Sequence, residues 1–314
     1  MPTFSLPSLE NIREAHTAIQ PFIHRTPVMS SSAINIMAGC SIFFKCENLQ
    51  KVGAFKARGA ANAVRKLSDS QKLKGVATHS SGNHAAALAR AAQVAGIPAY
   101  IVMPKTAPEI KKAAVASYGG EIIECEPTQQ AREEMLGKVV EKTGATFIHP
   151  YDFMDVIEGQ ATAALELIED VEGLDVIITP VGGGGLLAGT LLTAGYMNPS
   201  LEVYAGEPQG ADDAFRSLQT GERQPSLKPN TIADGLLTSL GEINFAIIQG
   251  RIKEIITVSD EEIKAAMKLI LERMKIVIEP SSAVPLAAIL KKKETFAGKN
   301  VGVILTGGNV DLGI

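Results

Sequence analysis

One lysine of the sequence lies where two neighbouring elements can hold a reactive amine. Lys56 follows the apolar segment 42–44 and precedes a helix-like run, with Phe55 directly before it. The polar turn 80–84, Ser-Ser-Gly-Asn-His, comes a few dozen residues later, and an unbroken run of four glycines occupies 182–185. An amine, a turn rich in hydrogen-bond donors and a turn of bare backbone N–H groups together suit a small molecule that carries an aldehyde and a phosphate.

Pyridoxal phosphate has those requirements. A lysine amine forms a Schiff base with its aldehyde, side-chain donors hold its ring and the carboxylate of the substrate, and glycine N–H groups hold its phosphate. The cofactor is an electron sink, and the protein selects which bond at the α-carbon of an amino acid breaks. The sequence therefore predicts amino-acid chemistry at Lys56.

The glycine run stands between a strand-like segment, 176–180, and a helix-like segment that starts at Leu186. Glycines let several backbone N–H groups approach one anion, and the N-terminus of the following helix adds a partial positive charge. The run is neither GxGxxG nor GxxxxGK[ST], which argues against a dinucleotide site or a P-loop. A tight turn with close strand–helix packing is the alternative interpretation.

The polar turn follows an apolar strand-like segment and opens an alanine-rich helix. Ligands of α/β sheets bind at the carboxyl ends of strands, so these hydroxyls, this amide and this imidazole can bind an amino-acid carboxylate and a ring oxygen. Helix capping by Ser80 or Ser81 is the alternative, and it is compatible with ligand binding. Asn83 is a candidate donor to the phenolic oxygen of the cofactor, and His84 has the alternative of being a core histidine.

Two further turns carry polar groups. The loop after residue 204 offers Glu207, the Ala211 carbonyl and Asp213, which are oxygen ligands suited to a hard divalent cation. On the pattern alone, a strand end followed by an acidic helix cap is the favoured interpretation of that loop. Near the C-terminus Thr306 precedes two glycines and can bond a ring nitrogen, with a simple turn as the alternative.

The composition is that of a soluble globular protein. The 314 residues are 46% hydrophobic and 20% charged, and 30 basic against 34 acidic residues give a net charge of −4. No basic stripe with interleaved aromatic residues is present, so nucleic-acid binding is not expected. No apolar segment reaches the roughly 20 residues that a membrane span needs. Three cysteines without CxxC spacing argue against a disulfide framework or a zinc site, and a cytoplasmic protein is expected.

Short apolar runs alternate with helix-like runs along the chain. Continuous apolar strands separated by helices are typical of a mainly parallel sheet covered on both faces, which is an α/β fold. Four consecutive βα units, from about residue 75 to residue 149, can form a compact lobe inserted into a larger one. The predicted strands are 41–46, 75–79, 98–103, 121–124, 146–149, 176–180, 202–207, 254–258 and 301–306, and the predicted helices are 58–67, 83–95, 108–118, 129–143, 159–170, 186–196, 260–274 and 282–292.

Taken together, these motifs resemble the fold-type II pyridoxal-phosphate enzymes, which share the tryptophan synthase β-like fold. Within them the chain is most similar to the group of serine racemases and serine/threonine dehydratases. The resemblance runs from His24-Arg-Thr-Pro27 to Val310-Asp-Leu312 and rests on motif order, spacing and residue types. It implies two lobes, each with a mainly parallel sheet flanked by helices: a large cofactor-binding domain of residues 1–74 and 150–314, and a small domain of residues 75–149 that closes over the substrate.

The resemblance implies a role for each motif. Lys56 would carry the cofactor, the glycine run would hold the phosphate, and Thr306 would face the ring nitrogen, where a neutral hydroxyl leaves that nitrogen largely unprotonated. The implied cofactor-binding residues are Phe55, Lys56, Asn83, Gly182, Gly183, Gly184, Gly185, Gly235, Glu279 and Thr306, and the implied substrate-binding residues are Ser80, Ser81, Asn83, His84, Arg132 and Thr238.

Ser81 bears on the reaction that the resemblance implies. Racemisation takes a proton from one face of the α-carbon and delivers one to the other face. Lys56 would serve one face and Ser81 the other, as in serine racemases. Threonine dehydratases of this group often carry alanine here, whereas hydroxyaspartate dehydratases can share Ser-Ser-Gly-Asn-His. The implied function is a serine racemase that also eliminates the β-hydroxyl of serine, with a threo-3-hydroxyaspartate or L-threonine/L-serine ammonia-lyase as the alternative.

The resemblance also implies ligands besides pyridoxal phosphate. Glu207, the Ala211 carbonyl and Asp213 match the structural magnesium or calcium site of the group, which reverses the interpretation drawn from the pattern alone. Some members bind ATP between subunits as an activator, and a homodimer is the expected assembly. The matching ATP positions are Ser31, Ser32, Lys51, Tyr118 and Asn309, although Ala86 and Val52 replace polar residues found there.

Several positions depart from the common pattern of the group. The frequent Gly-Gln-Gly-Thr is Gly-Gln-Ala-Thr at 159–162, and Ala54 stands where serine is common. His149-Pro150-Tyr151-Asp152 differs from several racemases and is closer to the dehydratases, as is the segment 241–245. These departures bear on substrate preference and not on the cofactor.

Overall fold

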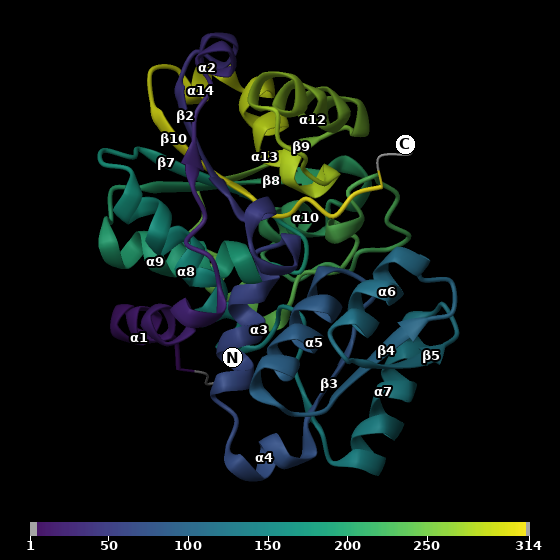
Figure 1. Ribbon diagram of the computed structural model, residues 1–314. Helices are drawn as coiled ribbons and strands as arrows, with labels where there is room; N and C mark the ends of the chain where they lie inside the picture. Colours follow the sequence, from purple (N-terminus) through teal and green to yellow (C-terminus); the bar gives the residue numbers. More distant parts are fainter. Residues whose placement is uncertain (1–4, 312–314) are drawn as a thin grey trace.

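Two separate sheets organise the chain in the computed structural model, which describes residues 5–311 (Figure 1). Leu312, the end of the C-terminal motif, lies outside the described residues. The larger sheet has the strand order β1-β2-β10-β7-β8-β9, and the smaller has the order β5-β4-β3-β6. All neighbouring strands are parallel except β1 and β2. The strands are β1 (Val28–Met29), β2 (Ser41–Cys46), β3 (Val76–His79), β4 (Ala99–Pro104), β5 (Glu121–Cys125), β6 (Thr146–Phe147), β7 (Val176–Pro180), β8 (Glu202–Pro208), β9 (Glu254–Val258) and β10 (Asn300–Leu305).

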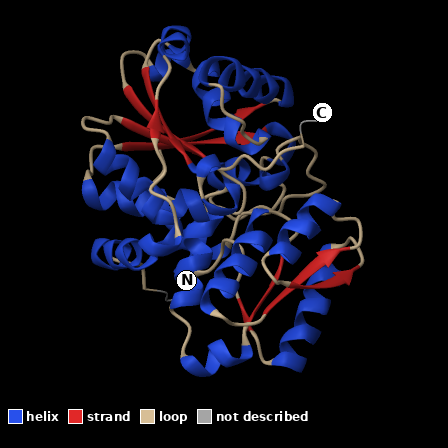
Figure 2. Cartoon of the chain, viewed as in Figure 1, coloured by secondary structure: helices blue, strands red, loops and turns tan. Residues whose placement is uncertain are grey.

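Helices pack on both faces of each sheet, as Figure 2 shows. In the large lobe α2, α12 and α13 cover one face, and α8 and α9 cover the other. In the small lobe α5 covers one face and α7 the other. The α-helices are α1 (Leu9–Ile19), α2 (Ser32–Ala38), α3 (Lys56–Arg65), α4 (Asp69–Lys74), α5 (Asn83–Ala95), α6 (Glu109–Ser117), α7 (Gln129–Thr143), α8 (Met154–Asp170), α9 (Gly185–Met197), α10 (Asp213–Thr220), α11 (Glu242–Ile248), α12 (Asp260–Met274), α13 (Pro280–Lys291) and α14 (Lys293–Phe296).

The continuous apolar strands are explained by burial on both faces. Successive side chains of a strand point to opposite sides of the sheet. In β7, Val176 and Ile178 pack with α2, α12 and α13, whereas Ile177 packs with α8 and α9. The predicted α/β class with two lobes is therefore confirmed.

Each predicted strand has a counterpart among the described residues, whereas several short or amphipathic elements were not predicted. The two-residue strand β1 is too short to show a period. Helix α1 was missed because its capping box pairs Ser8 with Asn11, in place of the glutamate or glutamine that the common pattern has. Helix α8 starts at Met154 and not at residue 159.

The predicted domain division after residue 74 and after residue 149 stays a prediction. The small sheet contains only strands between these limits. Helix α3 lies before residue 74, yet its Ala60, Ala63 and Val64 share a buried cluster with Leu88 of α5 and Ile101 of β4. Helix α3 therefore packs between the lobes and contributes to the core of the small one.

The polar turns lie at carboxyl ends of parallel strands in both sheets. Strand β3 ends at His79, directly before the turn 80–84, and β7 ends at Pro180, just before the glycine run. Strand β10 ends at Leu305, directly before Thr306. This is the edge where α/β sheets bind ligands.

Candidate active site

The segment that precedes α3 is attached to the turn after β10. The N–H of Phe55 donates to the Thr306 carbonyl at 2.9 Å, and Ala54 forms an antiparallel bridge with Gly307. Lys56 is the first residue of α3. These backbone contacts fix the amine of Lys56 relative to the end of the large sheet.

The Lys56 amine donates to the Pro150 carbonyl at 2.8 Å and lies 5.1 Å from the centroid of the Phe55 ring. Burial lowers the pKa of this amine from 10.5 to about 8, and the negative charge of Glu279 opposes that shift. Near pH 8 a large fraction of the amine is therefore neutral, which is the nucleophilic form. The contact with Pro150 was not predicted, because a backbone carbonyl leaves no signal in the residue types.

Glu279 and Asn83 connect the two lobes near Lys56. The amide nitrogen of Asn83 donates to both carboxylate oxygens of Glu279, at 3.1 and 3.0 Å. The amide nitrogen of Asn309 donates to the Asn83 side-chain oxygen at 2.9 Å. Burial raises the pKa of Glu279 to about 7, and the hydrogen bond from Asn83 opposes the shift. Glu279 can therefore hold or release a proton near neutral pH.

Thr306 is buried, and its hydroxyl lies 2.9 Å from that of Ser282. The Ser282 hydroxyl also lies 2.7 Å from the Gly307 carbonyl and accepts from the Gly307 N–H at 2.8 Å. Ser282 has one hydroxyl proton, so it donates either to that carbonyl or to Thr306. When it donates to Thr306, the Thr306 proton is available for a ring nitrogen. Ser282 was missed because a lone serine at the start of a helix is common.

The glycine turn forms a buried cradle of free donors. A Cβ added at Gly183 would lie 2.3–2.5 Å from three ring carbons of Tyr151. Gly184 has a φ of +92°, and a Cβ there would lie 2.6 Å from Leu240. Within residues 5–311 the N–H groups of 182–184 make no hydrogen bond, and α9 starts at Gly185 without a side-chain cap. Free N–H groups at the N-terminus of a helix fit a phosphate.

The polar turn 80–84 is half-buried except for its last residue. The Ser80 hydroxyl accepts from the Gly82 N–H at 3.4 Å, whereas the Ser81 hydroxyl makes no hydrogen bond within the part of the chain that is described. Helix α5 begins at Asn83 without a side-chain cap, so the capping interpretation is wrong. The hydroxyl of Ser81 is thus available to a ligand.

His84 is buried, and its Nε2 lies 3.3 Å from the Ile148 carbonyl. Its Nδ1 has no partner among the residues described. Burial, together with the positive charge of Lys56, holds the pKa of His84 well below 6.5, so the ring is neutral at neutral pH. Its role toward a substrate stays a prediction.

Three further predicted residues differ in their surroundings. The Nε of Arg132, at the start of α7, is buried and has no partner in the described region. Thr238 is exposed. Gly235 is exposed as well, and its N–H donates to the Ser281 hydroxyl at 3.2 Å. Their contacts with cofactor or substrate stay predictions.

The predicted cation site contains two fully buried carboxylates. Glu207 accepts from the N–H groups of Ala214 and Phe215, at 2.9 and 2.8 Å, and Asp213 accepts from the Leu240 N–H at 2.8 Å. The second oxygen of Asp213 has no partner in residues 5–311. Burial holds the pKa of Glu207 well above 4.5 and raises that of Asp213, and the charge of Asp213 adds to the shift of Glu207. A buried pair of carboxylates with an unpartnered oxygen fits a divalent cation.

The predicted ATP positions lie on both lobes. Ser31 and Ser32 stand at the start of α2, at the top of Figure 1, and Tyr118 follows α6 in the small lobe. Asn309 donates to the Val52 carbonyl at 2.8 Å, next to Lys51. The ATP site was predicted between subunits, and it stays a prediction.

A buried ion cluster surrounds Arg58, two residues after Lys56 in α3. The guanidinium of Arg58 is fully buried and makes paired hydrogen bonds with Glu47, at 2.7 and 2.8 Å, and with Glu166, at 2.9 and 2.8 Å. It also donates to Thr162 at 3.2 Å, which uses its fifth N–H. Glu166 contacts Lys45 at 2.7 Å as well. The cluster ties the first turn of α3 to β2 and α8.

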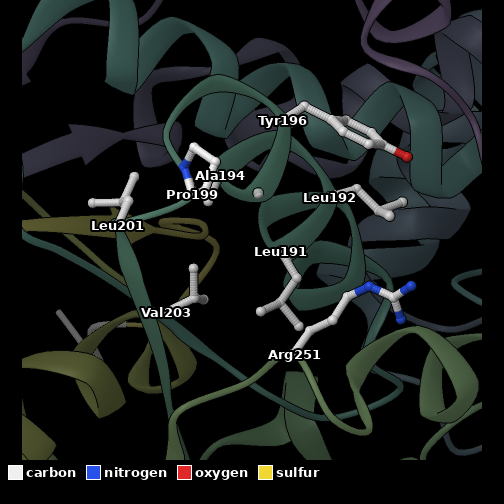
Figure 3. Close-up of a pocket in the computed structure, with 9 residues that line it drawn as sticks. Leu191, Leu192, Ala194, Tyr196, Pro199, Leu201, Val203 and Arg251 are labelled. Atoms are coloured by element: carbon white, nitrogen blue, oxygen red, sulfur yellow. The ribbon is translucent and has the colours of Figure 1, made fainter.

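A separate cavity of about 310 Å³ lies between the end of α9 and the start of β8 (Figure 3). Its walls include Leu191, Leu201 and Val203, with Tyr196 and Arg251 also lining it. It is at the amino edge of β8, opposite the edge that carries the polar turns. It therefore has no part in the site around Lys56.

Comparisons with known proteins identify the family of the chain. The protein family described as pyridoxal-phosphate dependent enzyme matches residues 19–307. A β-hydroxyaspartate dehydratase of Paracoccus denitrificans is 53% identical over 98% of this chain and 98% of its own length. A serine racemase of Dictyostelium discoideum is 53% identical over 97% of this chain and 95% of its own. The solved structure of maize serine racemase has a TM-score of 0.96 at 47% identity, covering 98% of this chain and 95% of that one.

No helix within residues 5–311 combines the length and the apolar character that crossing a bilayer requires. The fold with two mainly parallel sheets, the glycine cradle at the start of α9 and the lysine with a lowered pKa all suit the cofactor of the matched family. The chain belongs to the family of pyridoxal-phosphate-dependent enzymes.

Proposed function

We propose that the protein is a serine racemase that also eliminates the β-hydroxyl of serine, with pyridoxal phosphate as its cofactor. The observation that carries the proposal is the hydroxyl of Ser81, which has no hydrogen-bond partner among residues 5–311 and belongs to the same candidate site as the Lys56 amine and the glycine cradle. The serine racemases similar to this chain support the same substrate.

The cofactor would be held by residues from both lobes. Lys56 would bind its aldehyde carbon, the N–H groups of the glycine turn would bind its phosphate, and Asn83 and Thr306 would bind the ring oxygen and ring nitrogen. When bound, pyridoxal phosphate withdraws electrons from the α-carbon of the attached amino acid. Thr306 would be a neutral partner for the ring nitrogen, so it would moderate that withdrawal.

The protein would supply two proton-transfer groups for racemisation. The Lys56 amine, with a pKa near 8, takes a proton on one face of the α-carbon, and the Ser81 hydroxyl returns one on the other. The serine carboxylate would be held by Ser80, Asn83 and His84 in the same turn. Elimination requires a proton for the departing β-hydroxyl, which Lys56 can deliver once it is protonated.

A 3-hydroxyaspartate dehydratase is the second candidate, because Arg132 would supply a positive charge for a second carboxylate. The Arg132 guanidinium contains a buried N–H without a partner among the described residues. Its charge also contributes to the lowered pKa of His79, after burial as the main cause, and His79 directly precedes Ser80. The similar β-hydroxyaspartate dehydratase favours the same alternative.

The remaining ligands and the assembly are part of the proposal. Glu207, the Ala211 carbonyl and Asp213 would bind Mg²⁺ or Ca²⁺, which is supported by the Asp213 oxygen that has no partner among the residues that the structure describes. ATP would bind between the subunits of a homodimer as an activator. The protein would work in the cytoplasm.

A substrate panel with one variant tests the two candidates. The purified protein, with pyridoxal phosphate and Mg²⁺, is given L-serine, D-serine, L-threonine and threo-3-hydroxyaspartate, and keto acid and amino-acid enantiomers are measured. The racemase proposal expects D-serine from L-serine, and it expects Arg132→Met to lower kcat/KM for serine by at least as large a factor as kcat/KM for 3-hydroxyaspartate. The dehydratase candidate replaces the racemase proposal if two results are found together. The wild type prefers 3-hydroxyaspartate, and Arg132→Met lowers kcat/KM roughly tenfold or more for that substrate alone.

A further inference from the structure

The segment His149-Pro150-Tyr151-Asp152 crosses from the small lobe to the large one and contacts both Lys56 and the start of α11. The Pro150 carbonyl accepts from the Lys56 amine at 2.8 Å. The Asp152 carboxylate accepts from the N–H groups of Glu242, at 2.9 Å, and Asn244, at 3.2 Å. His149 Nδ1 accepts from the Asp152 N–H at 2.9 Å, which fixes the turn of the segment itself. The segment therefore links Lys56 to the start of α11.

The ring of Tyr151 occupies the space that a side chain at residue 183 would need. Its Cγ and both Cδ atoms lie 2.3–2.5 Å from the position of a Cβ on Gly183, and its carbonyl oxygen lies 2.8 Å from one on Gly185. The amide nitrogen of Asn244 donates to the Tyr151 carbonyl at 3.0 Å and to the Gly183 carbonyl at 2.7 Å. The ring packs edge-on against His149, with centroids 4.6 Å apart. Tyr151 thus packs against the cradle and is itself held by Asn244 and by the ring of His149.

The hydroxyl of Tyr151 reaches the loop that follows Gly235. It interacts with the side chain of Thr238, which is exposed. Burial raises the pKa of Tyr151 to about 12, and the interaction with Thr238 opposes the rise. The phenol therefore stays protonated over the working pH range and can act as a hydrogen-bond donor. The next part of the loop is fixed independently, because the Leu240 N–H donates to Asp213 at 2.8 Å.

We propose that Tyr151 is a positioning residue with two separable functions: its ring holds the glycine cradle in its phosphate-binding form, and its hydroxyl orients Thr238 toward the amino-acid substrate. The second function rests on the proposed racemase and dehydratase activity, whereas the first does not.

Two substitutions separate the ring from the hydroxyl. Tyr151→Phe keeps the ring against Gly183 and removes only the hydroxyl, whereas Tyr151→Leu removes the flat ring. Tyr204→Phe is the matched control, since that hydroxyl bonds Glu202 at 3.4 Å at the amino edge of the large sheet, away from the site. For each protein we would measure the dissociation constant of pyridoxal phosphate, the thermal midpoint, and kcat and KM for whichever panel amino acid the wild type converts.

The proposal expects different results from the two variants. Tyr151→Phe should bind the cofactor within about twofold of wild type and raise KM about fivefold with kcat nearly unchanged, as expected for one lost hydrogen bond. Tyr151→Leu should raise the cofactor dissociation constant roughly tenfold or more while its apoprotein keeps a cooperative thermal transition. Tyr204→Phe should match the wild type in cofactor affinity, kcat and KM.

The outcomes distinguish this inference from the proposed function. Wild-type affinity for the cofactor in Tyr151→Leu would overturn the function of the ring, and a wild-type KM in Tyr151→Phe would overturn that of the hydroxyl. If Tyr151→Phe lowers kcat and leaves KM unchanged, that result also contradicts the proposal that the Tyr151 hydroxyl orients Thr238 toward the substrate. If the proposed function is wrong, the wild type itself will convert none of the β-hydroxy amino acids. The dissociation constant of the cofactor in Tyr151→Leu would still decide the function of the ring.

Discussion

Replacing Arg58 by methionine removes the charged centre of the buried ion cluster and keeps the length of an unbranched side chain. The guanidinium makes five hydrogen bonds, four of them to the carboxylates of Glu47 and Glu166. After the substitution Glu166 keeps Lys45 at 2.7 Å, whereas Glu47 keeps only uncharged partners among the described residues. In Arg58→Met we therefore expect the carboxylate of Glu47 to stay fully buried without a cation beside it.

The cost follows from that unpaired charge. Removing one partner of a buried ion pair typically destabilises a protein by about 3–5 kcal/mol, because the other charge stays buried without compensation. If this explanation is right, adding Glu47→Gln to Arg58→Met should recover about 1–2 kcal/mol, because it removes the uncompensated charge. Arg25→Met is the control, since Arg25 is 45% exposed and its pairs with Glu169 and Asp170 should contribute about 1 kcal/mol or less.

Urea unfolding of the four proteins, followed by circular dichroism, measures these differences. We expect the order of stability to be wild type, Arg25→Met, the Arg58→Met/Glu47→Gln double variant and then Arg58→Met. The reasoning is refuted if Arg58→Met costs no more than Arg25→Met, or if the double variant is less stable than Arg58→Met alone.

Three further predictions concern the site. The rate at which the apoprotein captures pyridoxal phosphate should rise with pH with a midpoint near 8, because the neutral form of Lys56 accumulates above its lowered pKa. In Glu279→Gln that midpoint should fall, because the negative charge that raises the pKa of Lys56 is gone. An unchanged midpoint would contradict the assignment of the midpoint to Lys56. Gly183→Ala should weaken cofactor binding roughly tenfold or more, because the added methyl group clashes with the Tyr151 ring. Gly195→Ala, whose Cβ meets nothing within 4 Å, should bind the cofactor as the wild type does. Equal cofactor affinities of the two variants would rule out the glycine cradle as the phosphate site. Mg²⁺ or Ca²⁺ should raise the thermal midpoint of the wild type but not of Asp213→Asn. The rise should shrink as the pH is lowered, since the raised pKa of the site carboxylates lets protons compete with the cation. A pH-independent rise in both proteins would place the cation elsewhere.

Local patterns predicted the fold and the main groups of the site. The alternation of apolar runs and helices is a property of neighbouring residues, and so is a strand followed by glycines or by a threonine. Lys56, the glycine run and Thr306 could therefore be found from the sequence, and the resemblance to a family supplied their roles.

The contacts that hold these groups could not be predicted in the same way. Arg58 bonds Glu166 across 108 positions of the chain, and nothing near either residue indicates the pairing. The Pro150 carbonyl that accepts from Lys56 belongs to a backbone group that every residue has. Tyr151 was noticed only as a departure from the racemases, because its packing under Gly183 depends on how the lobes meet.

The products formed from L-serine by the wild type and by Ser81→Ala test the central claim most directly. D-serine and pyruvate are measured in the same sample, by chiral chromatography and by a coupled dehydrogenase, with pyridoxal phosphate and Mg²⁺ present. The proposed function predicts both products from the wild type, and from Ser81→Ala the loss of D-serine with pyruvate retained, because only the second face of the α-carbon loses its proton donor. Pyruvate without D-serine from the wild type, or D-serine formed equally well by Ser81→Ala, would contradict it.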